Sequence, residues 1–217
     1  PEDGEAHTHQ NHARQRRGPS ARRSRERPRT QIGIELISMK TATVQTNTFN
    51  ALKGDFGYTS PMQAPRVVKI VVSCGVGSVK DKKRLELIVD RLARITGQAP
   101  AVRGAKKSIA NFKVRTGDVV GYQVTLRGAH GKSFLDKLIH IVLPRVKDFR
   151  GIKTSAIDEM GNISIGLKEH TVFPETSDED SKDIFGLAVT IVTTAKNKKE
   201  AESFLRHLGV PLQEANK

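Results

Sequence analysis

The feature that most constrains the fold is a repeated change in the spacing of apolar side chains, from residue 41 almost to the end of the chain. Some stretches place an apolar residue at every second position, as a half-buried strand does. Others place them three and four apart, as one face of a helix does. Because each pattern leaves one apolar face to be covered, strands and helices must pack together in a common core.

Four stretches have the character of strands. The first is a run rich in β-branched residues that two glycines end, and the other three alternate apolar positions with intervening ones. The predicted strands are residues 66–73, 122–126, 163–167 and 187–191.

Four further stretches have helical spacing. In the clearest, residues 82–95, five apolar residues fall on one face and a glycine follows as a stop. A proline is expected to end the third helix and a glycine the last. The predicted helices are residues 41–56, 82–95, 133–142 (ended by Pro144) and 201–208 (ended by Gly209).

Strands and helices are interspersed, and several strands are close enough in sequence to pair antiparallel. The expected fold class is therefore α+β, with a mainly antiparallel sheet and helices packed on one of its faces. A chain of 217 residues suits one such domain with a tail. We expect a single domain over residues 39–217.

The first 30 residues contain only three apolar side chains, all of them alanine. Such a segment cannot bury enough surface to offset the entropy of ordering it, so residues 1–38 are predicted to be a disordered, Arg-rich extension. Residues 1–30 have no apolar core of a secretory signal. One hypothesis is that Met39 is the true start of the protein.

Cysteine content and hydropathy narrow the class further. Cys74 is the only cysteine, so no disulfide can form within the chain, and its apolar neighbours predict a buried thiol. No run approaches the ~18 apolar residues that a membrane span needs, and no membrane partner is expected.

Positive charge is concentrated in the middle of the chain. The net charge is +14, and residues 60–150 hold 19 Lys and Arg against six Asp and Glu. Residues 151–217 are net acidic. A field concentrated in this way favours a polyanion as partner, although a basic surface without a partner would have the same composition.

Motifs for small-molecule chemistry are incomplete. Residues 75–80 (GVGSVK) have lysine where a dinucleotide loop needs its third glycine, and they have no Gly-Lys-Ser/Thr ending. The acidic stretch 175–183 lacks the order of a calcium loop and is predicted to be a solvated loop. No nucleophile, base and acid stand out as a group. We therefore expect no enzyme, no cofactor, no metal and no small-molecule substrate.

Two basic runs each surround one aromatic residue. They are residues 96–117, around Phe112, and residues 143–151, around Phe149. Cations on either side of a ring suit phosphate contacts with a base or ribose stacked on the ring. The alternative is that each phenylalanine is a core anchor and the cations lie on a solvated face. For each ring taken alone we favour the core anchor, and for the concentrated cations we favour RNA.

An ordered set of short motifs resembles the L-five family of 5S-rRNA-binding large-subunit ribosomal proteins, in its bacterial or organellar form. Each motif is weak alone, and the set in this order is specific. The motifs run from Ser60 to about Pro211 and are SPMQ at 60–63, GVG at 75–77, TGQ at 96–98, AKKS at 105–108, VTLRG at 124–128, PRV at 144–146, DFRG at 148–151, GN at 161–162, FPE at 173–175, TI at 190–191 and TTA at 193–195.

The resemblance implies a structural role in translation rather than catalysis. It implies that a sheet with helices on one side binds 5S rRNA, and large-subunit rRNA, in the central protuberance. It also implies that the loop after the AKKS motif approaches peptidyl-site tRNA, and that another surface contacts neighbouring ribosomal proteins, including a small-subunit head protein. The location would be a bacterial cytoplasmic or an organellar ribosome.

The family also indicates three polar 5S contacts, which fall here on Ser73, Gln98 and Thr125. Ser73 stands where the family has asparagine, and Arg103 belongs to a pair that replaces a commoner Thr–basic pair. With the neighbouring cations, the predicted rRNA contacts are Ser73, Gln98, Arg103, Lys106, Lys107, Thr125, Arg127, Arg145 and Arg150. The predicted tRNA-proximal loop contains Phe112, Lys113 and Arg115.

A different class of protein would also explain the charge. An RNA-dependent enzyme or an assembly chaperone binds RNA only transiently. A structural subunit, in contrast, remains with large subunits through a high-salt wash.

Overall fold

The computed structural model describes residues 47–79, 81–177 and 183–213. Within them one five-stranded sheet has the strand order β2-β3-β1-β5-β4, and every pairing is antiparallel. All four predicted strands are confirmed. The strands are β1 (Val67–Gly75), β2 (Ala101–Gly104), β3 (Val119–Leu126), β4 (Ile163–Leu167) and β5 (Leu187–Thr193).

Strand β2 was not predicted from the sequence. It has only four residues, all of them exposed, and therefore no buried face to create an alternation. Its place in the sheet comes from pairing with β3.

The predicted helices are present. Residues 41–46 of the first lie outside the described residues, and the other three have different limits. A helix covers residues 47–56. The others are α2 (Lys82–Thr96), α3 (Gly128–Lys137), the π-helical η3 (Leu138–Val142), α4 (Leu143–Arg145) and α5 (Lys198–His207). Short 3₁₀ turns also occur at η1 (Pro61–Gln63), η2 (Ala110–Phe112), η4 (Thr154–Ala156), η5 (His170–Val172) and η6 (Pro174–Thr176).

The third helix corrects one prediction, because Pro144 does not end it. The helical segment begins five residues earlier than expected and continues through Pro144 to Arg145. Pro144 falls in the first turn of α4, directly after the π-helical turn, where a residue without an N–H group is tolerated.

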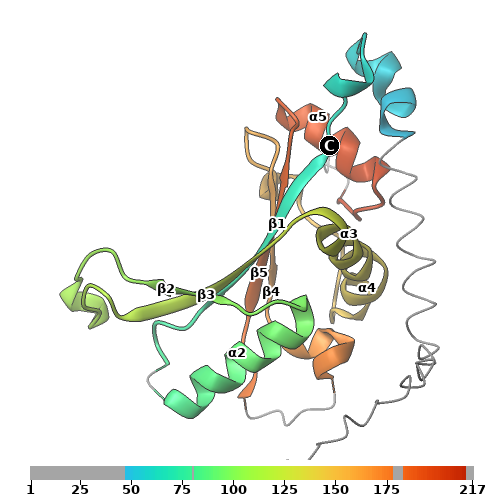
Figure 1. The fold of residues 1–217 in the computed structure, drawn as a ribbon. Coiled ribbons are helices and arrows are strands. Elements are labelled where there is room, and N and C mark those ends of the chain that lie inside the picture. The colour runs from blue at the N-terminus through green and yellow to red at the C-terminus, as the bar shows by residue number, and fades with distance from the viewer. Residues whose placement is uncertain (1–46, 80, 178–182, 214–217) are drawn as a thin grey trace, which may run out of the picture.

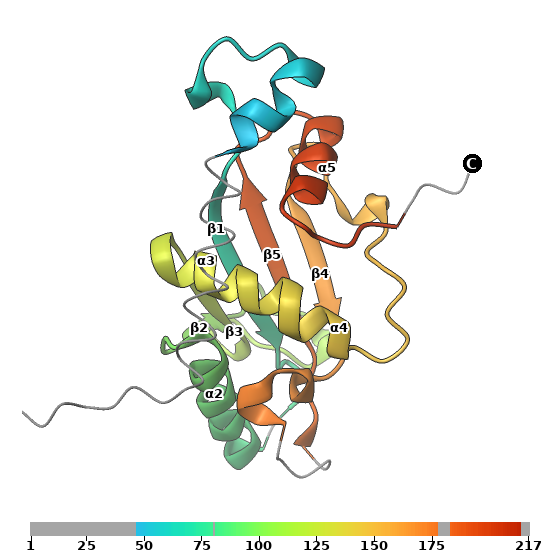
Figure 2. The ribbon, with the colours of Figure 1, turned by 90° about the vertical axis from the view of Figure 1, so that its right-hand side faces the viewer.

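Helices α2, α3, α4 and α5 cover one face of the sheet, which confirms the expected α+β architecture. Figure 2 looks onto this face, with the helices in front of the strands. The helices cover this face because it carries the apolar side chains of the strands. In β1, for example, Ile70, Val72 and Cys74 are buried while the alternate side chains are not. The buried Cys74 confirms that prediction.

The β2–β3 ribbon extends beyond the helical layer as a projecting arm, which we define as residues 101–123 (Figure 1). Gly121 lies where the arm leaves the sheet. A Cβ atom there would lie 2.9 Å from the carbonyl oxygen of Cys74, so only glycine lets β1 and β3 approach this closely. The predicted disordered extension, residues 1–38, lies outside the described residues, as do residues 178–182 of the acidic stretch.

Candidate nucleic-acid interface

The face of the sheet opposite the helices, which we name the open face, carries small side chains. Strand alternation places Ser73 of β1 and Thr125 of β3 on it, and both are half-buried. In the β1–β3 register Ser73 lies opposite Gln123, and Val71 lies opposite Thr125. Two predicted rRNA contacts, 52 residues apart in sequence, therefore become diagonal neighbours across one strand pair.

The row through Thr125 continues across the sheet. Val71 lies opposite Thr190 of β5, and Thr190 lies opposite Ser164 of the edge strand β4. The Ser164 and Thr190 hydroxyls lie 3.0 Å apart and share a hydrogen bond. Four strands thus contribute to one row in which three of the four side chains carry a hydroxyl group.

The charged side chains of the strands on the open face are all positive. None of the five strands contains an aspartate or glutamate. Lys69 and Arg103 lie on this face, and the Arg103 Nε–H donates a hydrogen bond of 2.6 Å to the Gln123 side-chain oxygen. Because Gln123 holds the Arg103 guanidinium on this face, the face suits an anionic partner.

At its tip the arm is held together by its own hydrogen bonds. Ile109 and Val114 pair backbone to backbone, and the Ser108 and Thr116 hydroxyls lie 3.0 Å apart. The backbone N–H of Arg115 donates to the Asp118 carboxylate at 2.7 Å. These bonds give the tip a defined shape without any packing against the main core.

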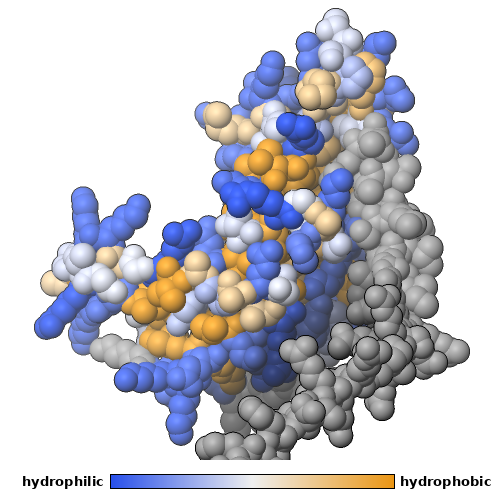
Figure 3. All heavy atoms as spheres, in the orientation of Figure 1, coloured by the Kyte–Doolittle hydropathy of each residue, from blue (hydrophilic) through white to orange (hydrophobic). Residues whose placement is uncertain are grey.

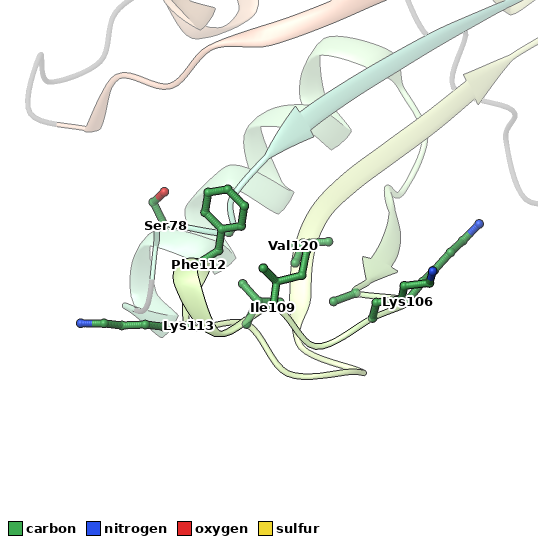
Figure 4. A pocket seen from close by; sticks show the side chains of 10 residues that line it. Ser78, Lys106, Ile109, Phe112, Lys113 and Val120 are labelled. Carbon is green, nitrogen blue, oxygen red and sulfur yellow. The ribbon is translucent and has the colours of Figure 1, made fainter.

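The arm exposes apolar side chains beside cations. Phe112 is 75% exposed and Ile109 is 47% exposed. For Phe112 the core-anchor interpretation is therefore wrong. Both side chains line a hollow of about 660 Å³. Lys106, Lys107 and Lys113 line it as well. Figure 4 shows Lys106 and Lys113 pointing away from it in opposite directions, and Figure 3 shows hydrophilic side chains projecting around the tip.

A second basic hollow, about 780 Å³ in volume, lies where α4 and the following loop meet β4. Arg145 and Arg150 line it, and both are exposed. Phe149 is only half-buried, and its packing against the core supports the core-anchor interpretation for this ring. Asp148 beside it adopts a left-handed backbone conformation (φ 55°), which turns the loop around the hollow.

Most of the predicted contacts lie on one of three surfaces: the open face, the arm and the second hollow. Gln98 and Arg127 lie outside them. Gln98 is half-buried between α2 and β2, where its backbone N–H and C=O both bond the Thr96 hydroxyl. Arg127 is exposed just after β3. Sequence reasoning missed Gln123, Thr190 and Ser164, although the alternation of β3, β4 and β5 would have placed them on the face opposite the core.

No group of His, Cys, Asp and Glu side chains that could hold a metal ion occurs within the ranges that the structure describes. In the same ranges no helix has the length and apolar character required to cross a membrane. Burial raises the pKa of the Cys74 thiol to about 11, so at neutral pH it is a buried hydrogen-bond donor, 3.2 Å from the Gly186 carbonyl oxygen.

An acid-free sheet face, a basic arm and an α+β core suit a structural nucleic-acid-binding protein. Comparison with known proteins is more specific. The family model described as Ribosomal protein L5 matches residues 60–115, and the model of that family's C-terminal part matches residues 119–212. The chain belongs to the ribosomal protein L5 family, which confirms the predicted family. Members of this family are structural proteins, which confirms the prediction that the chain is not an enzyme.

Curated relatives agree along most of the chain. "Large ribosomal subunit protein uL5" of Anaeromyxobacter sp. (strain K) is 46% identical over 164 residues, which cover 75% of this chain and 91% of the relative. The proteins of the same name from Natranaerobius thermophilus and Ureaplasma urealyticum are 48% and 46% identical, over 74% and 75% of this chain and 90% and 89% of theirs.

Proposed function

We infer that this chain is a structural constituent of the large ribosomal subunit that binds 5S rRNA through its open face. The observation that carries the proposal is the meeting of Ser73, Thr125 and Arg103 on one sheet face that contains no acidic residue in any strand. Hydroxyl and amide groups suit ribose and base edges, and Arg103 suits a phosphate.

The arm has a different partner in this proposal. Its tip stands away from the open face and presents Phe112 between cations, an arrangement that suits a base or ribose on the ring and phosphates on either side. We assign Lys113 and Arg115 to peptidyl-site tRNA. The second hollow, with Arg145 and Arg150, is assigned to rRNA.

The remaining partners are those expected of a protein in the central protuberance of the large subunit, the location that the family resemblance implies. They are large-subunit rRNA and neighbouring ribosomal proteins, among them a small-subunit head protein. The ribosome would be that of a bacterial cytoplasm or of an organelle.

The salt dependence of binding tests the proposal. Counterions released from phosphates make the logarithm of the affinity fall linearly with the logarithm of the salt concentration. If several cations of residues 60–150 contact phosphate, the slope for bacterial 5S rRNA should be on the order of −4 to −7. A slope near zero would contradict an electrostatic interface.

A second measurement distinguishes a structural protein of the ribosome from a factor that binds it only transiently. The protein should remain with large subunits through a high-salt wash, because it is held by several surfaces at once. Release with the wash would instead support an RNA-dependent enzyme or an assembly chaperone.

A further inference from the structure

We propose that a groove between α2 and the base of the arm is a docking site for an amphipathic helix of a partner protein. The groove, which we name the α2 groove, has a volume of about 560 Å³. None of the predicted RNA contacts lines it. The inference therefore goes beyond the proposed function and concerns a surface that the RNA interfaces do not use.

Helix α2 is apolar over a wider arc than the core covers. At about 100° per residue, its four buried residues span about 100° of the helix circumference, and they are Ile88, Leu92, Ile95 and Thr96. Val89 and Ala93 extend the apolar arc by about a further 60°, and both are only half-buried. With the half-buried Leu85 they form a row at intervals of four residues along one wall of the groove. This row is an apolar ridge that the sheet leaves partly uncovered.

The opposite wall of the groove is also apolar. Ala99 and Pro100 line it just before β2, and Tyr122 of β3 contributes a buried ring. Val102 lies opposite Tyr122 in the β2–β3 register, is 58% exposed and extends the apolar surface. Figure 3 shows hydrophobic side chains gathered where α2 meets the base of the arm, with hydrophilic ones around them. An apolar surface with a polar rim is typical of a protein interaction site.

The spacing of the row and the nearest strand edge both favour a helix as the occupant. A row at intervals of four residues, about 12 Å long at about 1.5 Å per residue, is the kind of ridge that packs against a second helix. An extended peptide would instead have to pair with β2, which is the edge strand beside the groove. Pro100 directly precedes β2, and the register shifts between Arg103 and Gly104, so this edge offers few backbone partners.

Charges on the rim define the chemistry of the partner helix. Glu86 and Asp90 place two carboxylates beside the apolar row, and these repel phosphates, so the rim favours a protein over RNA. Asp90 is already paired with Arg94 at 3.0 Å. Lys82 and Glu86 are exposed on the rim, four residues apart, and neither has an ion pair with another described residue. The matching helix carries an acidic residue opposite Lys82 and a cationic one opposite Glu86, which fix its register.

Binding of a probe peptide to the full chain tests the site. The probe is a fluorescent amphipathic helix of about five turns, with leucines at intervals of three and four residues. It carries one glutamate and one lysine placed to face Lys82 and Glu86, and it is made in both orders because the helix can dock in either direction. Fluorescence anisotropy should show saturable binding of one order. Val89→Asp should weaken that binding roughly tenfold or more, because it places a charge in the apolar contact. Glu86→Lys should weaken it about fivefold to tenfold, and a probe with its lysine changed to glutamate should restore the affinity.

The matched control is Ala51→Asp, which adds the same charge as Val89→Asp at an exposed position outside the groove and should bind the probe as the wild type does. Glu86→Lys guards against loss of fold in Val89→Asp, because the Glu86 side chain is exposed. The absence of saturable binding, equal losses in the control and groove variants, or no restoration by the charge-reversed probe would each overturn the proposal.

Crosslinking in cells of the source organism identifies the natural occupant. Benzoylphenylalanine in place of Glu86 should crosslink on irradiation to a protein segment with helical spacing of apolar residues, and benzoylphenylalanine in place of Ala51 should not crosslink to that segment. Mass spectrometry identifies the crosslinked peptide. Crosslinks from position 86 to RNA, to a second copy of this chain or to its own residues 1–46 would overturn the proposal, as would the absence of any crosslink. None of these outcomes bears on 5S rRNA binding, which is measured separately.

Discussion

The Tyr58 hydroxyl donates a hydrogen bond to the carboxylate of Glu200, which joins two buried residues 142 positions apart in the chain. The other oxygen of the same carboxylate accepts from the backbone N–H of Lys196 at 2.7 Å. Tyr58 also stacks on Phe56, with the ring centroids 5.9 Å apart. This contact ties the segment before β1 to the first turn of α5.

Tyr58→Phe should lower the free energy of unfolding by about 1–2 kcal/mol, because the buried Glu200 loses one of its two hydrogen-bond donors. Burial, and then the adjacent Glu200 carboxylate, raise the pKa of Tyr58 above its usual range. Since the folded state keeps the phenol protonated, this stabilisation is fully present below pH ~10 and is lost as the pH rises further. Urea unfolding at pH 7 to 11 measures it.

Tyr122→Phe is the matched control, since the chain has only two tyrosines and this hydroxyl takes no part in the Glu200 contact. The control should lose less stability than Tyr58→Phe at pH 7. Equal losses in the two variants would mean that the Tyr58–Glu200 bond contributes nothing specific.

Thr125→Ala should weaken 5S rRNA binding by about 1–3 kcal/mol, because a buried RNA group loses its hydrogen-bond partner. Gln98→Ala should do the same if its side chain contacts RNA. Ser73→Asn should strengthen binding or leave it unchanged, since Ser73 lies opposite Gln123 on an uncovered face, where a larger amide side chain can be accommodated. Titration of labelled 5S rRNA at one fixed salt concentration compares the three, and a large loss from Ser73→Asn would show that β1 is misaligned with the family.

Lys113→Ala combined with Arg115→Ala should leave the fold and 5S binding almost intact, because the arm tip is separate from the open face. The same change should weaken peptidyl-site tRNA retention in assembled ribosomes, by about 1 kcal/mol for each phosphate contact at an exposed site. Filter binding of 5S rRNA to the isolated variant measures the first effect. Filter binding of tRNA to ribosomes that contain the variant measures the second.

The control for the arm is Lys153→Ala combined with Lys199→Ala, which removes the same charge from two exposed positions outside it. If 5S binding collapses in the arm variant while tRNA retention is unaffected, the two roles have been assigned in reverse.

Cys74 should not react with a thiol reagent at pH 8 while the protein is folded. It is 3% exposed and, with its pKa raised to about 11 by burial, holds very little thiolate at that pH. Absorbance after addition of a disulfide reagent, with and without urea, measures this. One thiol should appear only on unfolding, and rapid reaction of the native protein would show that the β1 core face opens.

The sequence alone determined the fold class, four of the five strands, the burial of Cys74 and the concentration of charge in the middle of the chain. These properties depend on local periodicity or composition, which can be read within a few residues. The family motifs also identified Ser73 and Thr125 as candidate contacts, although nothing local showed that they share a face.

Only the tertiary structure decided which side chains become neighbours across the sheet and which stay exposed, because both depend on pairing between distant segments. The register of β1 with β3 and β5 brings Ser73 beside Gln123 and completes the row from Thr125 to Ser164. The exposure of Phe112 was decided in the same way. A phenylalanine is apolar wherever it occurs, and only the hydrogen bonds that close the arm on itself keep this ring away from the core. Alternation within a strand shows which side chains face away from the core, but it contains no record of which strands are neighbours or of their register. For that physical reason the neighbours on the open face could be described only after the strands were assembled.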